Sequence, residues 1–259
     1  MASPPRKSRP EPVPPELETG GTQAEFLQRY DADAYVRPSV TVDIVLFTVV
    51  EGALRVLLIR RKKHPFKDAW ALPGGFIHAD ESAEDAARRE LAEEAGISDI
   101  FLEQLYTFSN PGRDPRTWVI SVAYYALVAS ERLHLRAGTD ASDVDWFLLK
   151  DGRSGVEVHR VGGGGPVELA FDHAEILATA VKRIRGKLDY VPIGFQLLPE
   201  RFTLSELQTV HEAVLGKPLD KRNFRAKVQR DGLVKATKEK RGGAHRPAQL
   251  FRYVDNKRE

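Results

Sequence analysis

Apolar and polar residues alternate along much of the first half of the chain, which is the pattern of β-strands. Ser39–Val50 and Leu54–Arg61 are rich in β-branched and aliphatic residues, and Glu51-Gly52 between them suits the turn of a hairpin. Later runs with the same character are Leu102–Phe108, Trp118–Val128 and Val144–Leu149. The pattern therefore predicts five strands before residue 150.

Helical patterns lie before, between and after these strands. Thr22–Tyr30 predicts a short helix capped by its first residue, with a glutamate three residues later. Ser82–Ala95 is alanine-rich, acidic and followed by Gly96, which predicts a well-bounded helix. Leu169–Lys187 has helical periodicity, whereas the Gly-rich segment Arg153–Pro166 predicts a loop.

The last third of the chain predicts a separate domain. Asp189–Pro199 contains two prolines and a glycine and is interpreted as a junction. The elements expected after it are Leu204–Leu215 (helix), Asp220–Asp231 (helix), Leu233–Ala236 (strand), Thr237–Pro247 (basic loop) and Gln249–Val254 (strand). This is the element order of a winged helix-turn-helix. The expected division is a Pro-rich flexible tail over 1–21, a first domain over 22–190 and a winged helix domain over 191–259.

Composition excludes several classes of protein. The 259 residues are 42% hydrophobic, enough for one large or two modest folded domains. The absence of cysteine excludes a disulfide scaffold, a cysteine-ligated zinc site and a cysteine nucleophile. No apolar run reaches the roughly 18–20 residues of a membrane helix. The first fifteen residues hold six prolines and no apolar core, so a signal peptide is not expected, and the protein is predicted to be cytoplasmic without membrane contact.

Charge is divided unevenly along the chain. The formal net charge is +2, but residues 201–259 carry 15 basic and 7 acidic residues, a net +8. The remaining residues carry 24 basic and 30 acidic residues, a net −6. Such asymmetry predicts that the C-terminal domain binds a polyanion.

An acidic helix face is the strongest sign of chemistry. Glu90, Glu93 and Glu94 stand at i, i+3 and i+4, which places three carboxylates on one face of the predicted helix. Like charges at this spacing destabilise a helix unless a cation neutralises them, and oxygen ligands suit Mg²⁺ or Mn²⁺. Taken alone, the three glutamates also fit a solvated acidic surface.

The surrounding residues favour the metal interpretation. Every fixed position of the pattern G-x5-E-x7-R-E-U-x-E-E-x-G-U, where U is aliphatic, is filled by Gly75, Glu81, Arg89, Glu90, Leu91, Glu93, Glu94, Gly96 and Ile97. The segment resembles the Nudix hydrolase signature. The resemblance implies an α/β Nudix fold, a mixed sheet between helices, and Mg²⁺-dependent cleavage of a nucleoside diphosphate derivative.

The same resemblance implies roles for the signature residues. Glu90, Glu93 and Glu94 are expected to bind the metal, with Glu81 assisting. Arg89 is expected to brace a neighbouring carboxylate such as Glu81. The general base is left open between a signature glutamate, for which Glu93 and Glu94 rank first, and a loop residue elsewhere.

Two flanking segments, Arg60–Phe76 and Tyr106–Val119, resemble Nudix proteins that act on ADP-ribose. The expected substrate contacts are Arg60, Gly74, Gly75, Arg113, Asp114 and Arg116, because arginines can grip phosphates and an aspartate can accept from a ribose hydroxyl. The alternative for the last three is a charged surface turn. Arg61, Lys62 and Lys63 are expected to be solvated, and Phe108 either stacks on adenine or belongs to the core.

In the basic domain, Phe224 and Val228 form a narrow apolar stripe on a helix whose other positions are largely basic. The expected DNA contacts are Lys221, Arg222, Asn223 and Arg225 on the helix and Arg241, His245 and Arg246 on the wing. The alternative is a protein-interaction module. With the ADP-ribose-type Nudix domain, Phe202–Gln208 and Asn223–Arg225 resemble the NrtR-type transcriptional regulators of NAD metabolism, over about Pro38–Tyr253.

The combined resemblance implies a dual protein. It would hydrolyse ADP-ribose, or a similar nucleoside diphosphate derivative, to AMP and ribose 5-phosphate, and would regulate transcription in response to ADP-ribose. Its partners would be this nucleotide, double-stranded DNA and a second copy in a homodimer. The alternative is a catalytically silent repressor of NAD metabolism genes that only senses ADP-ribose.

Overall fold

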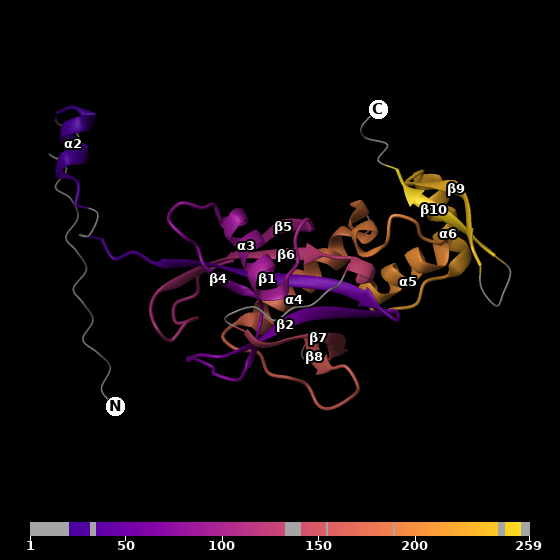
Figure 1. The fold of residues 1–259 in the computed structure, drawn as a ribbon, viewed down its shortest axis with the longest axis horizontal. Helices are drawn as coiled ribbons and strands as arrows, with labels where there is room; N and C mark the ends of the chain where they lie inside the picture. The colour runs from indigo at the N-terminus through magenta and orange to yellow at the C-terminus, as the bar shows by residue number, and fades with distance from the viewer. Residues whose placement is uncertain are drawn as a thin grey trace.

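A mixed β-sheet forms the centre of the first domain (Figure 1). The computed structural model describes residues 21–31, 35–132, 141–153, 155–188, 190–242 and 247–254. The sheet order is β5 (Phe101–Phe108), β6 (Val119–Leu127), β1 (Ser39–Val50), β2 (Ala53–Arg61), β7 (Ala141–Gly152) and β8 (Gly155–Arg160). Two short strands, β3 (Trp70–Ala71) and β4 (Gly74–Phe76), pair with β2 and β1. Strands β1 and β6 run parallel and their neighbours antiparallel.

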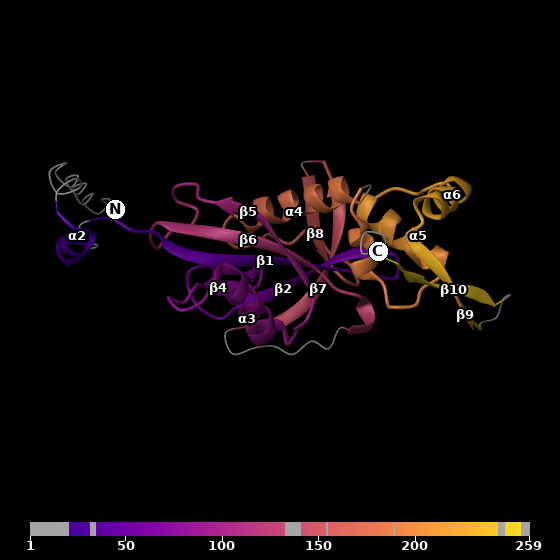
Figure 2. The ribbon, with the colours of Figure 1, turned by 90° about the horizontal axis from the view of Figure 1, so that it is seen from above.

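Helices cover both faces of this sheet. In Figure 2, α3 (Ala83–Ala95) and α4 (His173–Lys187) lie on opposite sides. Because side chains alternate along a strand, Ile44 and Leu46 of β1 pack in the cluster that includes α3, whereas Val45 and Phe47 pack in the cluster that includes α4. The expected α/β mixed sheet between helices is therefore confirmed.

Local signals in the sequence produce the predicted turns and caps. Glu51 and Gly52 have φ angles of 52° and 73°, which suits the two-residue turn that joins β1 and β2. Ser82 caps α3, and Gly96 ends it with a φ of 68°. The short helix α2 (Gln23–Arg29) begins at Thr22 with the expected capping box.

Two element predictions are wrong. The segment predicted as a loop over Arg153–Pro166 contains β8, which pairs with β7, because its alternating valines outweigh the flanking glycines. The helix predicted within Leu169–Lys187 is present as α4, which begins at His173 directly after Asp172. The predicted basic loop Thr237–Pro247 begins as a strand, because β9 (Val234–Arg241) continues into this segment as far as Arg241. The Pro-rich tail lies outside the described residues, apart from Gly21.

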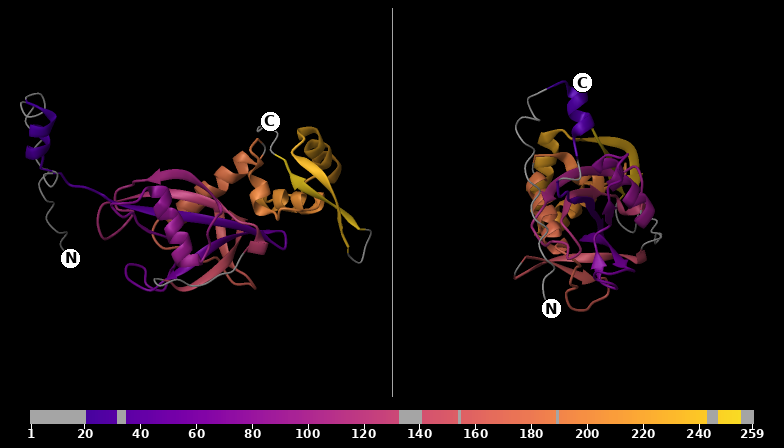
Figure 3. Two further views of the ribbon diagram at one scale, coloured as in Figure 1. Left: turned by 45° about the horizontal axis from the view of Figure 1, so that its top comes forward. Right: turned by 90° about the vertical axis from the view of Figure 1, so that its left-hand side faces the viewer.

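The second domain is a winged helix. Helices α5 (Leu204–Leu215) and α6 (Lys221–Asp231) precede the antiparallel strands β9 and β10 (Ala248–Tyr253). A single 3-10 turn over Pro192–Leu197 lies within the predicted junction, of which Asp189 lies outside the described residues. The domain packs at one end of the sheet (Figure 3), and its core is continuous with the α4 side.

A polar contact also joins the two domains. The Nε of Arg185 on α4 donates to the Val214 carbonyl oxygen at 2.8 Å, and its terminal nitrogens pair with Asp151 at 2.9 and 3.0 Å. No helix within the described ranges is both long and apolar enough to cross a membrane.

Candidate functional site

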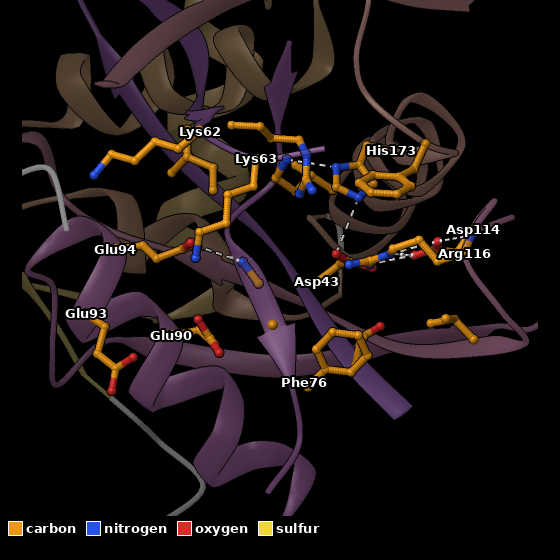
Figure 4. Close-up of a pocket in the computed structure, with 18 of the residues that line it drawn as sticks. Asp43, Lys62, Lys63, Phe76, Glu90, Glu93, Glu94, Asp114, Arg116 and His173 are labelled. Carbon is orange, nitrogen blue, oxygen red and sulfur yellow. Dashed lines mark hydrogen bonds and ion pairs between the residues drawn. The ribbon is translucent and has the colours of Figure 1, made fainter. Parts of the chain in front are cut away.

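A cavity of about 430 Å³ opens beside α3 (Figure 4). Its walls come from β1, the β2–β3 loop, β4, α3, the β5–β6 loop and the segment that leads into α4. Figure 4 shows Glu90, Glu93 and Glu94 on one side, with Asp114 and Arg116 across the cavity. The cavity therefore joins the acidic helix to the predicted arginine-containing loop.

Two glycines let the backbone of β4 approach α3 closely. A Cβ on Gly75 would lie 2.1 Å from Oε1 of Glu90, and a Cβ on Gly74 would lie 2.2 Å from the Val42 carbonyl oxygen. The backbone nitrogen of Gly74 donates to Glu94 at 2.9 Å. A larger residue at 75 would displace the Glu90 carboxylate, and one at 74 would collide with the backbone of β1, so both glycines have a steric cause.

Arg89 organises the carboxylates around it. Its Nε and Nη2 donate to Glu81 at 3.0 and 2.7 Å, and its Nη1 donates to Glu90 at 2.8 Å. The expected contact between Arg89 and Glu81 is present. Hydrogen bonds from Arg89 lower the pKa of Glu81 to about 2, whereas burial and then the charges of Glu93 and Glu81 raise the pKa of Glu90 against the effect of Arg89.

The fit of these residues to a divalent cation rests on their donor chemistry. Glu90, Glu93 and Glu94 all line the cavity and offer only oxygen, as Mg²⁺ and Mn²⁺ prefer. The raised pKa of Glu90 reflects crowded, buried negative charge that a cation would neutralise. Within the described ranges, no three His, Asp or Glu side chains converge as a ready metal cluster; Oε1 of Glu90 accepts from Arg89, and Oε2 of Glu94 accepts from the Gly74 backbone.

A buried ionic network supports the far wall of the cavity. The Nη2 of Arg113 lies 2.7 Å from Asp172 and 3.2 Å from Asp43, and Asp43 also accepts from Ser121 at 2.5 Å and lies 3.4 Å from Nε2 of His173. Burial would raise the pKa of Asp43, but His173, Ser121 and Arg113 together lower it to about 2. The side chain of Arg113 is only 5% exposed, so this arginine holds the wall together.

Asp43, Asp172 and His173 were not recognised from the sequence. Asp43 and His173 line the cavity, and Asp172 reaches it through Arg113. They come from segments far apart in the chain, and none belongs to a motif with a fixed spacing. No local signal could have identified them.

The other residues of the predicted loop also have partners. Asp114 accepts from the Nη2 of Arg116 at 2.7 Å and from its Nε at 3.0 Å, so the carboxylate is occupied by its neighbour rather than directed at a ribose. The guanidinium of Arg116 lies 5.4 Å from the ring centre of Phe76, at the cavity edge. Phe108 is 4% exposed and belongs to the core, so that alternative is confirmed.

At the end of β2 the structure differs from the sequence interpretation. Arg60 lies outside the cavity lining, and its Nε donates to the Asp68 carbonyl oxygen at 3.2 Å. Arg61, Lys62 and Lys63 all line the cavity; Lys62 and Lys63 are exposed, as expected, whereas Arg61 is half-buried. Consecutive side chains of a strand point to opposite faces, so Arg60 and Arg61 lie on different sides of β2.

In the winged helix domain the predicted helix residues occupy the first turns of α6. Lys221 and Arg222 are exposed, and Asp220 caps the helix by accepting from the backbone nitrogen of Asn223 at 2.8 Å. The side chain of Arg225 is half-buried, and its Nε has no hydrogen-bond partner within the described part of the chain. Phe224 and Val228 are buried as the apolar stripe predicted.

The wing is described only in part. Arg241 pairs with Glu206 of α5 and donates to the Arg201 carbonyl oxygen at 3.3 Å. This contact ties the end of β9 to the helices. His245 and Arg246, the other predicted wing contacts, lie outside the described residues.

Comparison with known proteins divides the chain in the same way. Residues 37–160 match the NUDIX domain family, and residues 194–253 match the NrtR DNA-binding winged helix domain family. The chain is 35% identical over 235 residues to the ADPR responsive transcriptional repressor NtrR of Acinetobacter baylyi, covering 90% of this chain and 89% of that protein. It is 36% identical over 143 residues to the ADP-ribose pyrophosphatase of Methanocaldococcus jannaschii, covering 55% of this chain and 73% of that protein. Among solved structures, NrtR of Shewanella oneidensis complexed with a 27mer DNA is similar with a TM-score of 0.68 and 37% identity, covering 83% of this chain and 93% of that one.

Proposed function

The chain belongs to the NrtR family, with a NUDIX domain followed by an NrtR DNA-binding winged helix domain, and from this premise we propose that it is an ADP-ribose-responsive transcriptional repressor that also hydrolyses its effector. The observation that carries the proposal is the cavity in which Glu90, Glu93 and Glu94 of the signature face basic side chains. Similarity to an ADPR responsive transcriptional repressor and to an ADP-ribose pyrophosphatase supports the nucleotide and both activities.

The reaction would be the hydrolysis of a diphosphate. Water adds to one phosphorus, the bridging P–O bond breaks, and AMP and ribose 5-phosphate each keep one phosphate. Mg²⁺ or Mn²⁺, held by Glu90, Glu93 and Glu94 with Glu81 assisting, would polarise the diphosphate and make the attacking water more acidic.

The residues of the chain would position this chemistry. Arg89 fixes Glu81 and Glu90, and the Gly74 backbone orients Glu94. Glu93 has a side chain that is 55% exposed at the cavity, which suits a group that takes a proton from entering water. We therefore rank Glu93 first as general base and Glu94 second.

A coupled phosphatase assay tests the enzyme. We expect phosphate release from ADP-ribose that requires Mg²⁺ and is lost in Glu94→Gln. Glu84→Gln is the matched control, because Glu84 lies on the same helix, is exposed and pairs only with Arg88 among the ion pairs described. Equal loss in both variants would show that charge on the helix matters rather than the cavity.

One observation favours the alternative of a silent sensor. Among the described residues, no three His, Asp or Glu side chains converge as a ready metal cluster. Intact ADP-ribose binding in calorimetry, with no turnover above background at any Mg²⁺ concentration, would establish the sensor and reject the enzyme.

The winged helix domain, proposed to span 191–259 after a Nudix domain over 22–190, would bind DNA as part of a homodimer. Selection from random duplexes would give the preferred sequence, which a twofold dimer makes roughly palindromic. We expect binding to weaken with salt, to respond to ADP-ribose and to fall in Arg222→Ala but not in Arg88→Ala. Equal affinity for every duplex, unaffected by ADP-ribose, would reject the regulator.

A further inference from the structure

The arginines of the cavity are not equivalent. Four of them line it: Arg61, Arg89, Arg113 and Arg116. Three bond carboxylates at 2.7 Å, namely Arg89 to Glu81, Arg113 to Asp172 and Arg116 to Asp114. Within the described ranges, no carboxylate forms an ion pair with Arg61. Its guanidinium is the cavity arginine whose charge is left for a ligand.

Neutral groups hold Arg61 in place. Its Nε donates to the Pro65 carbonyl oxygen at 2.9 Å, and its guanidinium carbon lies 4.7 Å from the ring centre of Phe171. Among the contacts described, only Nε of Arg61 donates a hydrogen bond, and the ring of Phe171 contacts the face of the guanidinium. Its two terminal nitrogens can therefore donate to a ligand. The side chain is therefore oriented without being neutralised.

Phe171 adopts a backbone conformation that aromatic residues rarely take. Its φ is +54°, which is sterically unfavourable for a bulky side chain. The centre of its ring lies 4.8 Å from the ring centre of Phe66, in an edge-on arrangement. It lies 5.3 Å from the ring centre of His173, whose plane is tilted by 33°. Such strain persists where surrounding contacts hold it, and it is concentrated at functional sites. Here it places the ring under Arg61 at the cavity wall.

Burial and a neighbouring cation both disfavour the charged form of Arg61. Burial, and after it the positive charge of Arg116, lowers the pKa of Arg61, only partly offset by the carboxylates of Asp114, Glu94 and Asp43. A bound phosphate would relieve both effects, since it supplies negative charge and accepts two parallel hydrogen bonds from a guanidinium.

We propose that Arg61, supported by Phe171, is the residue that binds the diphosphate of the nucleotide. The inference rests on the proposed function for the identity of the nucleotide but not for the chemistry of the contact. Arg60, the adjacent residue, lies outside the cavity lining, and its Nε donates to the Asp68 carbonyl oxygen. Arg60 and Arg61 carry the same charge and differ in position. Replacing each in turn therefore tests whether position in the cavity determines the affinity for the diphosphate.

Calorimetry without divalent metal tests the assignment, with ADP-ribose and inorganic diphosphate as the two probes. We expect Arg61→Gln to weaken both roughly ten- to hundredfold, as for loss of a charged hydrogen bond. Arg60→Gln should leave both dissociation constants within about twofold. Phe171→Leu should weaken both less than Arg61→Gln, because the cation remains but its aromatic support is lost.

The outcomes separate the two proposals. Wild-type affinity in Arg61→Gln, or an equal loss in Arg60→Gln, would overturn the role of Arg61 while leaving ADP-ribose as ligand. Binding of diphosphate that depends on Arg61, without binding of ADP-ribose, would reject the proposed nucleotide and keep the contact. If the wild-type protein bound neither probe, both proposals would fail. An unchanged thermal midpoint in Arg61→Gln would exclude misfolding. If Arg61→Gln unfolded, the folded variant Arg61→Lys would be tested instead. Binding of both probes by Arg61→Lys that is no stronger than by Arg61→Gln would then refute the assignment.

Discussion

Replacing Asp43 by asparagine would remove the charge at the centre of the buried network behind the cavity. The carboxylate accepts from Ser121 at 2.5 Å and is approached by Arg113 at 3.2 Å and His173 at 3.4 Å. Asparagine has nearly the same shape, so the packing against β6 and α4 is retained and the electrostatic contribution is isolated. The positive groups around position 43 would then lack their main counter-charge.

The magnitude follows from the titration of the carboxyl group. The pKa of Asp43 is about 2, against an ordinary value of 3.8. A pKa shift of one unit corresponds to about 1.4 kcal/mol. The charged form should therefore contribute about 2–3 kcal/mol to the free energy of unfolding. Because the pKa is lowered in the folded protein, this contribution is complete above about pH 5 and is lost as the pH falls through 4 towards 2.

Urea unfolding followed by tryptophan fluorescence would measure the difference, since Trp70 and Trp146 are buried in the same domain. We expect Asp43→Asn to be less stable than wild type by about 2–3 kcal/mol at pH 7 and pH 5, and by about half as much at pH 3. Asp80→Asn, at an exposed position, controls for the general loss of a negative charge. A difference as large at pH 3 as at pH 7 would refute the electrostatic origin.

Three further substitutions test local packing through the free energy of unfolding. Gly186→Ala should raise it by about 0.5–1 kcal/mol, because position 186 lies inside α4 with open space around a Cβ. Gly216→Ala should lower it by about 1–3 kcal/mol, because φ is +69° and the Cβ would lie 2.6 Å from an oxygen of Asp151. Arg185→Ala should lower it by about 1–2 kcal/mol through loss of the bonds to Asp151 and the Val214 carbonyl oxygen. A stabilised Gly216→Ala, or a neutral Arg185→Ala, would contradict the packing at the domain junction.

The elements predicted well from the sequence depend on interactions between residues close together in the chain. The caps of α3 join Ser82 to Asp85 and place Gly96 just after the helix, and the hairpin needs only Glu51 and Gly52. The acidic face of α3 is likewise a consequence of helical spacing. For these features a short window of sequence contains the whole physical cause.

The far wall of the cavity could not be predicted because its partners are distant in sequence. Arg113 meets Asp43 and Asp172 from positions 70 and 59 residues away. Arg60 and Arg61 end the same strand on opposite faces, and the face that borders the cavity is determined by segments distant in sequence. Arg60 was the expected substrate contact, whereas Arg61 lines the cavity.

Helix α4 has a part in both domains that its sequence periodicity alone does not indicate. Asp172 and His173 at its start belong to the network behind the cavity, and Arg185 in its last turn bonds α5 of the winged helix. Its 15 residues span about 22 Å. The apolar face of α4 is buried along this length. Because close-packed interiors transmit strain, a small displacement of one end of α4 should move its other end. Helix α4 is therefore one direct structural connection between the cavity and the winged helix, and the measurements of ligand and DNA binding proposed above bear on this element.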